Sequence, residues 1–262
     1  MKTALTIAGS DCSGGAGIQA DIKTFAAHNV YGMSIITAVV AENTVGVLGI
    51  EKISKQGILR QFKAVFEDIF PDSVKIGMLS ERDVCEAVYE GLETYKPKNI
   101  VIDPVLYAKD GTALTEESNM DFLIEKVFSK ADLLTPNIPE AEKITGRKIE
   151  TFEDVKRACG DICSMGIKAV LIKGGHFTGE PADTLYDGRN FRVYRSKRIN
   201  TKNTHGTGCT LSSAIAANLA KGCSAEGAVD SAKQYIYTAI ENSLALGRGN
   251  GPLNHMYSVF NR

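Results

Sequence analysis

Six short apolar runs recur along the chain, and they are separated by amphipathic stretches. The runs cover residues 3–8, 33–41, 74–77, 99–102, 131–135 and 168–173. Two of the intervening stretches place apolar side chains on one helical face: Ile18, Ile22, Phe25 and Ala26 in the first, and Ile58, Phe62, Val65 and Ile69 in the second. Strands that alternate with helices predict an α/β protein, in which helices cover both faces of a mostly parallel sheet.

A β-hairpin is expected late in the chain. Residues 183–188 and 190–195 are strand-like and are joined through Asp187-Gly188-Arg189. We find no repeat, linker or low-complexity segment, and 262 residues suit one large domain with a substantial core. A single domain over residues 1–262 is therefore predicted.

The composition excludes several classes of protein. Thirty basic and thirty-one acidic residues give a net charge of −1, which gives no reason to expect binding to nucleic acid or to an anionic membrane surface. The longest apolar runs are too short to span a bilayer, and Met1-Lys2 leads straight into a strand-like run, so no signal peptide is expected. Six scattered cysteines form no disulfide framework, and Cys159 with Cys163 lacks the second pair of a zinc site. We expect a cytoplasmic protein with reduced thiols.

Polar or glycine-containing segments follow the six apolar runs. They are Gly9-Ser10-Asp11, Glu42-Asn43-Thr44, Gly77-Met78-Leu79, Asp103-Pro104-Val105, Thr135-Pro136-Asn137 and Lys173-Gly174-Gly175. Each alone could be an ordinary turn. Ligands bind beyond the carboxyl ends of the strands in open α/β sheets, so together these segments predict a ligand site.

A glycine-rich turn begins the last apolar helical segment. Gly206-Thr207-Gly208-Cys209 precedes Leu211, Ile215 and Leu219, which recur every four residues. A turn that leads into a helix N-terminus suits a phosphate group, and a thiol placed there is expected to have a lowered pKa. The alternative is a plain tight turn followed by a buried cysteine.

A competing hypothesis comes from the first turn. Gly15-Ala16-Gly17-Ile18-Gln19-Ala20 fits the G-x-G-x-x-A pattern of dinucleotide-binding proteins, and Glu42 lies near the place of a ribose-binding acid. It would make the protein a dinucleotide-dependent oxidoreductase. However, residues 10–13 separate the pattern from the strand, and the pattern does not explain the late Gly206 turn.

Several motifs in register carry a family resemblance from residue 4 to about residue 240. They are Ala4 to Asp11, Ser13 to Asp21, Lys75-Ile76-Gly77-Met78-Leu79, Asp103-Pro104-Val105, Thr135-Pro136-Asn137 with Glu140, Lys173-Gly174-Gly175-His176, and Asn200 to Thr210. Together they resemble the bacterial hydroxymethylpyrimidine/phosphomethylpyrimidine kinases of thiamine biosynthesis, in the ribokinase-like superfamily. Sugar kinases of that superfamily carry an aspartate where this chain has Cys209.

The resemblance implies a ribokinase-like three-layer αβα sandwich and a homodimer. It implies that ATP, with Mg²⁺, phosphorylates 4-amino-5-hydroxymethyl-2-methylpyrimidine and then its monophosphate. The nearest alternative is a pyridoxine or pyridoxal kinase of the same branch, and a further one is an inactive nucleotide-binding regulator.

The resemblance also assigns the phosphate side of the site. The backbone of Gly206, Thr207, Gly208 and Cys209 would form an anion hole, and Cys209 would accept the proton of the substrate hydroxyl. Asp103 and Glu140 would lie near the metal, although Glu140 could simply be a carboxylate in the first turn of a helix. The implied ATP-binding residues are Asn137, Lys173, Gly174, Asp183 and Lys233, of which the lysines could instead be solvated.

The implied substrate-binding residues come from the amino-terminal half: Gly9, Asp21, Val40, Glu42 and Met78. Asp21 could instead be an exposed helix residue, and Val40 and Met78 could be plain core. Many relatives have glutamine at the position of Glu42. A glutamate only accepts hydrogen bonds, so it would prefer a pyrimidine protonated on a ring nitrogen. His176 and His205 lie inside motifs but receive no role.

Overall fold

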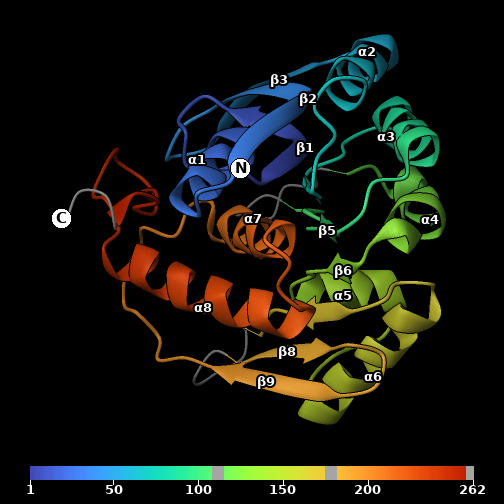
Figure 1. Ribbon diagram of the computed structural model, residues 1–262. Helices are drawn as coiled ribbons and strands as arrows, with labels where there is room; N and C mark the ends of the chain where they lie inside the picture. Colours follow the sequence, from blue (N-terminus) through green and yellow to red (C-terminus); the bar gives the residue numbers. More distant parts are fainter. Residues whose placement is uncertain (108–114, 175–181, 258–262) are drawn as a thin grey trace.

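The computed structural model describes residues 1–107, 115–174 and 182–257, and its centre is one continuous sheet between two layers of helices (Figure 1). The strand order is β3-β2-β1-β4-β5-β6-β7-β8-β9. The strands are β1 (Thr3–Asp11), β2 (Tyr31–Glu42), β3 (Val47–Lys52), β4 (Ser73–Ile76), β5 (Ile100–Ile102), β6 (Leu133–Leu134), β7 (Val170–Ile172), β8 (Ala182–Tyr186) and β9 (Phe191–Arg195).

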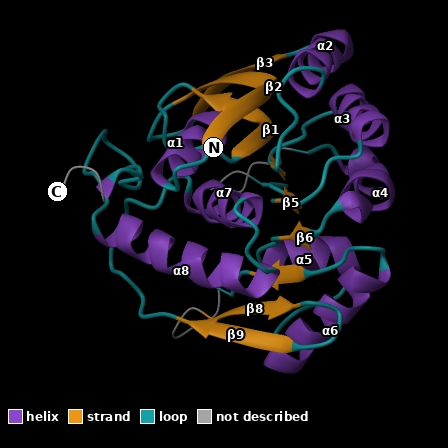
Figure 2. Ribbon diagram, in the orientation of Figure 1, coloured by secondary structure: helices purple, strands orange, loops and turns teal. Residues whose placement is uncertain are grey.

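Helices cover both faces of the sheet, as the alternating pattern predicts (Figure 2). They are α1 (Gly17–Ala27), α2 (Lys55–Phe66), α3 (Arg82–Tyr95), α4 (Met120–Phe122), α5 (Ile138–Thr145), α6 (Phe152–Ser164), α7 (Thr207–Ala220) and α8 (Ala225–Glu241). Short helical turns flank α4, at Glu117–Asn119, Leu123–Val127 and Phe128–Lys130. None of the described helices is both long and apolar enough to cross a membrane.

The core is divided by the sheet into two apolar clusters. Leu5 of β1 packs with Phe62 of α2 on one face, while Ala4 packs with Phe25 of α1 and Ile215 of α7 on the other. Neighbouring residues of a strand point to opposite faces, so one buried strand supplies side chains to both clusters. The predicted three-layer αβα sandwich is confirmed.

The edges of the sheet are antiparallel, whereas its centre is parallel. Strands β8 and β9 form the predicted hairpin, and β9 lies at one edge. The other edge is β3, which pairs with β2 and which the sequence did not predict. All six residues of β3 are exposed, so the strand lacks the alternation of buried and exposed residues that would have revealed it.

Candidate functional site

Three predicted substrate-binding residues meet where the parallel strands end. Gly9 of β1 lies beside Val40 of β2 and beside Met78, which follows β4: a Cβ at Gly9 would be 3.0 Å from Met78 Cε and 3.5 Å from Val40 Cγ2. Parallel strands bring their carboxyl ends to the same edge of a sheet, which explains why residues so distant in sequence gather here. Gly9 therefore leaves space between two apolar side chains.

The glycine turn before α7 packs against the loop after β1. Gly206 has a φ of 79°, and a Cβ on it would lie 1.8 Å from the carbonyl oxygen of Gly15. Only glycine fits both restrictions. No side chain caps the start of α7; the Thr207 N–H bonds to the Thr204 carbonyl oxygen at 3.4 Å, so the N–H groups that could meet an anion are those of Gly208 and Cys209. This is the geometry that the sequence predicted for a phosphate.

Asp103 and Lys173 face this helix start from the ends of β5 and β7. Lys173 Nζ donates to Asp103 Oδ1 at 2.7 Å, and Thr135 donates to the same oxygen. A Cβ at Gly208 would lie 3.2 Å from Asp103 Oδ2 and 3.6 Å from Lys173 Nζ. Burial would lower the pKa of Lys173, but the neighbouring carboxylates outweigh it and raise that pKa, so the lysine stays charged.

Cys209 lies in the first turn of α7, close to the backbone of Gly17. Burial raises the pKa of the Cys209 thiol to about 11, although the charge of Lys75 opposes this rise. The expectation of a lowered pKa was therefore wrong: at this half-buried position, loss of solvation outweighs the neighbouring positive charge. The thiol is protonated near neutral pH.

Glu140 and Asn137 form the start of α5. The Glu140 N–H donates to Asn137 Oδ1 at 2.9 Å, and the Asn137 N–H donates to Glu140 Oε2 at 2.8 Å, which is a capping box. Glu140 Oε1 accepts from the Leu106 N–H at 3.3 Å. Burial raises the pKa of Glu140, with Lys173 opposing and Asp103 reinforcing that shift. The ordinary explanation, a first-turn helix carboxylate, thus holds for Glu140, and it leaves the metal role open.

Asp103 and Glu140 match the chemistry of a magnesium site in kind. Mg²⁺ is usually held by one or two carboxylates together with water and substrate phosphates. Among the described residues, neither carboxylate belongs to a group of three ligating side chains. The pair therefore fits a metal that takes most of its ligands from elsewhere.

Asp183 of the β8–β9 hairpin bonds to two other predicted ATP-binding residues, Gly174 and Lys233. The Gly174 N–H donates to Asp183 Oδ1 at 2.9 Å, and Lys233 Nζ of α8 donates to Asp183 Oδ2 at 2.7 Å. A Cβ at Gly174 would lie 2.0 Å from the Ala182 carbonyl oxygen. Asp183 therefore fixes the segment after β7. Gly175 and His176, which complete that motif, lie outside the described residues.

Asp21 lies deeper than expected. Both Asp21 and Lys75 are 0% exposed, and Lys75 Nζ donates to the two Asp21 oxygens at 3.0 and 2.9 Å. Thr6 and Ser213 donate to the same carboxylate at 2.6 and 2.7 Å. The predicted direct contact between Asp21 and the substrate does not fit this geometry, because the carboxylate is sealed and fully bonded. We call Asp21 and Lys75 the core pair.

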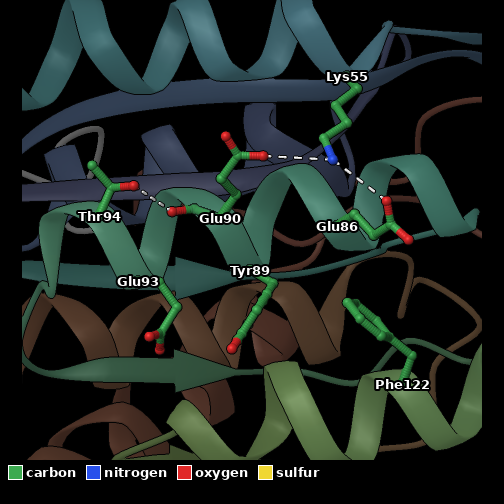
Figure 3. A pocket seen from close by; sticks show the side chains of 7 residues that line it. All are labelled: Lys55, Glu86, Tyr89, Glu90, Glu93, Thr94 and Phe122. Atoms are coloured by element: carbon green, nitrogen blue, oxygen red, sulfur yellow. Dashed lines mark hydrogen bonds and ion pairs between the residues drawn. The ribbon is translucent and has the colours of Figure 1, made fainter.

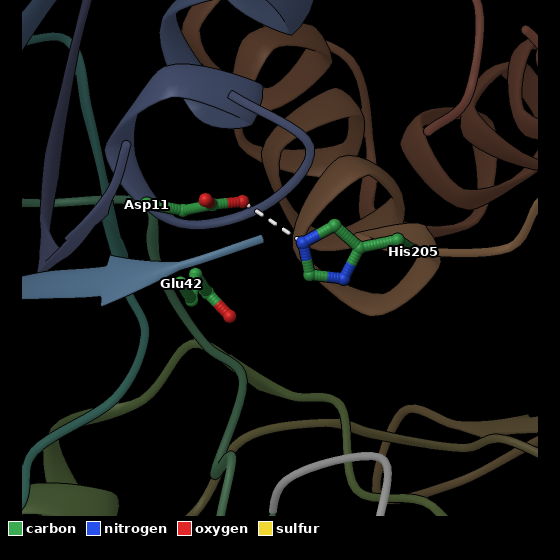
Figure 4. Close-up of side chains that lie close together, drawn as sticks. All are labelled: Asp11, Glu42 and His205. Atoms are coloured by element: carbon green, nitrogen blue, oxygen red, sulfur yellow. Dashed lines mark hydrogen bonds and ion pairs between the residues drawn. The ribbon is translucent and has the colours of Figure 1, made fainter. Parts of the chain in front are cut away.

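A second charged group was not foreseen. Asp11, Glu42 and His205 place one ligand-type atom each within 4.8 Å of one another (Figure 4). His205 Nε2 is 2.9 Å from Asp11 Oδ2. Burial and the charge of Asp11 raise the pKa of Glu42 to about 6, and His205 opposes this. The polar ends of β1 and β2 signalled Asp11 and Glu42, but no local pattern linked them to His205. We call these residues the open triad.

A groove elsewhere on the described surface lies away from these strand ends. It has a volume of about 490 Å³ and is formed by α2, α3 and α4 (Figure 3). Its acidic side chains are already paired: Glu86 with Lys55 and Arg82, Glu90 with Lys55, and Glu93 with Lys130. The groove therefore offers no uncompensated charge and none of the predicted chemistry.

Residues 11–254 match the family described as Phosphomethylpyrimidine kinase. This chain belongs to that family. A hydroxymethylpyrimidine/phosphomethylpyrimidine kinase of Bacillus subtilis is 45% identical to it, over 96% of this chain and 94% of the relative. Membership confirms the predicted kinase family and removes the support for an oxidoreductase.

Solved structures agree with the family assignment. A phosphomethylpyrimidine kinase from Clostridium difficile has a TM-score of 0.84 at 48% identity, over 92% of this chain and 100% of that one. A Bacillus subtilis pyridoxal kinase, solved as an ADP complex, has a TM-score of 0.91 at 38% identity over the whole of both chains. The fold is therefore shared between pyrimidine and pyridoxal kinases, and the side chains at the strand ends must distinguish them.

Proposed function

We propose that this kinase uses ATP and Mg²⁺ to phosphorylate the hydroxymethyl group of 4-amino-5-hydroxymethyl-2-methylpyrimidine, and then the resulting monophosphate. The observation that carries the proposal is the uncapped start of α7, with Cys209 in its first turn and with Asp103 and Lys173 facing it. Phosphoryl transfer depends mainly on positioning and on neutralising charge, and this arrangement supplies both.

The backbone from Gly206 to Cys209 would neutralise charge on the transferring phosphoryl group. Lys173 adds a positive charge that its neighbours keep in place. On the ATP side we propose Asn137 and Gly174, with Asp183 and Lys233 acting through the bonds that hold the Gly174 segment.

Asp103 and Glu140 would hold the magnesium ion, in part through water. Bound there, the ion would supply positive charge to the phosphate oxygens. Asp103 contributes its Oδ2, which faces Gly208, while its Oδ1 accepts from Lys173. Lys173 thus orients Asp103 and compensates the charge of both candidate ligands, Asp103 and Glu140.

Cys209 is proposed to receive the proton of the substrate hydroxyl. The thiol must first lose its own proton, and its raised pKa makes that costly in the free protein. Lys75 and the Gly17 N–H both favour the thiolate. A loose transition state needs little help from a base, so the proton of the substrate hydroxyl can leave late in the reaction.

The pyrimidine ring is proposed to lie against Gly9, between Val40 and Met78. Glu42 would accept a hydrogen bond from the exocyclic amine and share a proton with a ring nitrogen. Asp21 would act from beneath the site, through the core pair, rather than by touching the substrate.

Pyridoxal is the second candidate substrate, because pyridoxal kinases match this fold over the full chain. We favour the pyrimidine since the curated relatives at 42–46% identity include several hydroxymethylpyrimidine/phosphomethylpyrimidine kinases. The deciding experiment incubates the enzyme with ATP, Mg²⁺ and each alcohol and counts phosphates on the product by mass spectrometry. A pyrimidine diphosphate supports the full proposal, while phosphorylated pyridoxal alone would replace it.

A homodimer in the cytoplasm also belongs to this proposal. The edge strand β3 and the turn before it expose Val45, Val47, Leu48 and Ile50, with Leu48 80% exposed. An exposed apolar edge strand is prone to pairing with another chain, and a second copy would cover it. The six cysteines are all free, which suits a reducing compartment. Equilibrium sedimentation of the wild type and of Leu48→Glu tests the dimer, which the substitution should weaken.

A further inference from the structure

We propose that His205, held by Asp11, is a positioning residue that sets the charge of Glu42 and thereby selects an aminopyrimidine that shares a proton with this carboxyl group. The inference rests on the proposed contact between Glu42 and the substrate ring. Neither Asp11 nor His205 has a role in the site described so far.

Asp11 is fixed as an acceptor. It is 1% exposed, its Oδ1 accepts from the Ser13 N–H at 2.7 Å, and its Oδ2 accepts from the Ala16 N–H at 2.7 Å. These bonds and the one to His205 outweigh the effect of burial and hold the pKa of Asp11 well below its usual range. The carboxylate therefore stays charged and only accepts hydrogen bonds.

This acceptor decides the protonation of the His205 ring. Nε2 lies 2.9 Å from Asp11 Oδ2, so Nε2 must carry a hydrogen and donate it. Nδ1 is then the second polar atom of the ring. The ring packs against Gly15, where a Cβ would lie 2.3 Å from His205 Cδ2, so the glycine leaves the space that the ring fills. The backbone N–H of His205 is bonded to the Gly251 carbonyl.

Glu42 faces these two groups from the end of β2 (Figure 4). Within the described ranges, the charged groups that act on it are Asp11 of β1 and His205 of the loop before α7. The Cys12 thiol bonds to the Glu42 carbonyl oxygen and not to its carboxyl group. The ring is hydrogen-bonded to Asp11, and a carboxyl oxygen of Glu42 lies within 4.8 Å of both groups, close enough for its charge to depend on that ring.

The three side chains are also of kinds that bind metal ions. However, Asp11 already uses both oxygens for backbone N–H groups, and His205 Nε2 is directed at Asp11. The geometry therefore favours a hydrogen-bonded arrangement that exchanges a proton.

A shared proton links this charge to substrate choice. When the aminopyrimidine is neutral and Glu42 is ionised, one proton must be added before they can form two hydrogen bonds with each other. A protonated Glu42 already carries that proton. The KM for the pyrimidine should therefore rise with pH above the pH at which Glu42 ionises. His205 opposes the rise in the pKa of Glu42 and Asp11 reinforces it, so removing His205 raises that pH and removing Asp11 lowers it.

Carbon-13 NMR of the glutamate carboxyl groups tests the first step without substrate. Glu42 is identified as the signal that Glu42→Gln lacks. We expect His205→Gln, which keeps an N–H donor for Asp11 but cannot be charged, to move the Glu42 midpoint upward by about 0.5 to 2 pH units. Asp11→Asn should move it downward, and either variant suffices if the other does not fold. A midpoint that matches the wild type in the folded variants would overturn the proposal.

The second step is the KM for the pyrimidine between pH 5.5 and 8.5. In His205→Gln, the rise of KM should begin at a higher pH than in the wild type. A shifted midpoint with an unshifted KM profile would overturn the link to substrate selection. If the wild type did not phosphorylate the pyrimidine, the proposed function would fail, while the NMR result on Glu42 would stand.

Discussion

The core pair and the open triad are two charged groups that begin on neighbouring elements but differ in how completely they are paired. Asp21 accepts hydrogen bonds from Lys75, Thr6 and Ser213 and is fully buried. In the open triad, the imidazole is bonded to Asp11, while Glu42 lies within 4.8 Å of both and is only half-buried. Complete pairing fixes a buried charge, whereas incomplete pairing leaves a charge that can exchange a proton.

The core pair and the open triad also lie in different places relative to the proposed reaction site. Ser213, which bonds to Asp21, lies four residues after Cys209 and therefore one turn below it on the same face of α7. The core pair thus supports the helix that carries the proposed anion hole. The open triad lies where β1 and β2 end, beside the proposed ring site.

The largest effect is expected at Cys209, above the core pair. If the thiol receives the substrate proton, Cys209→Ala should lower turnover by roughly 10²–10⁴, the range of lost general-base catalysis. ATP binding, measured by calorimetry, should persist because backbone groups hold the phosphates. Since the pKa of Cys209 is about 11, wild-type turnover should rise from pH 7 to 9, and that rise should be absent from the variant. Near-normal turnover in the variant would refute the role.

Breaking the core pair should cost stability. Lys75→Met leaves Asp21 buried without its cation, which should lower the free energy of unfolding by about 3–5 kcal/mol. Asp21→Asn combined with Lys75→Met should recover much of that loss. Lys2→Met is the matched control, because its pair with Asp72 is exposed and should contribute less than about 1 kcal/mol. Urea denaturation provides the comparison, and equal losses in Lys75→Met and Lys2→Met would contradict it.

Removing the Glu42 carboxyl group should affect one substrate more than the other. Glu42→Ala leaves the amine and ring nitrogen of the pyrimidine unpaired, which should weaken transition-state binding by about 1–3 kcal/mol. Pyridoxine has no exocyclic amine, so its phosphorylation should change less. The measurement is kcat/KM for both alcohols. Intact pyrimidine turnover together with lost pyridoxine turnover would reverse the assignment.

A smaller effect is expected from Glu42 of the open triad on the stability of the protein without substrate. The folded-state pKa of Glu42, about 6, exceeds its ordinary value of 4.5, so the folded protein prefers the acid form. Wild-type stability should therefore fall as the pH rises from 4.5 through 6. Glu42→Gln removes this dependence and should be more stable by about 1 kcal/mol at pH 7, but not at pH 4.5. If stability changed with pH in the same way for the two proteins, the ionisation of Glu42 would not destabilise the fold.

The sequence predicted the layers of the fold because buried strands and amphipathic helices leave periodic patterns. It did not predict β3, whose residues are all exposed. The motifs assigned Gly9, Val40 and Met78 to one side of the site and Gly208, Asp103 and Lys173 to the other, and in the structure the residues of each set lie close together. Their roles in binding remain proposals.

Partners that are far apart in sequence were harder to predict. Asp21 was expected at the substrate, but its bonds come from β4 and α7, and no local pattern announces a buried partner. His205 pairs with Asp11 across 194 residues. The pKa of Cys209 was predicted in the wrong direction, because the sequence showed the helix start but not the burial of the thiol.

The pH dependence of KM for the hydroxymethylpyrimidine, measured for the wild type and for Glu42→Gln, tests most directly whether the open triad exchanges a proton with the substrate. A glutamine donates and accepts hydrogen bonds without ionising. We expect a wild-type KM that rises above about pH 6, by up to about tenfold per pH unit, and a much flatter profile for Glu42→Gln. Coincident profiles for the two enzymes would contradict it.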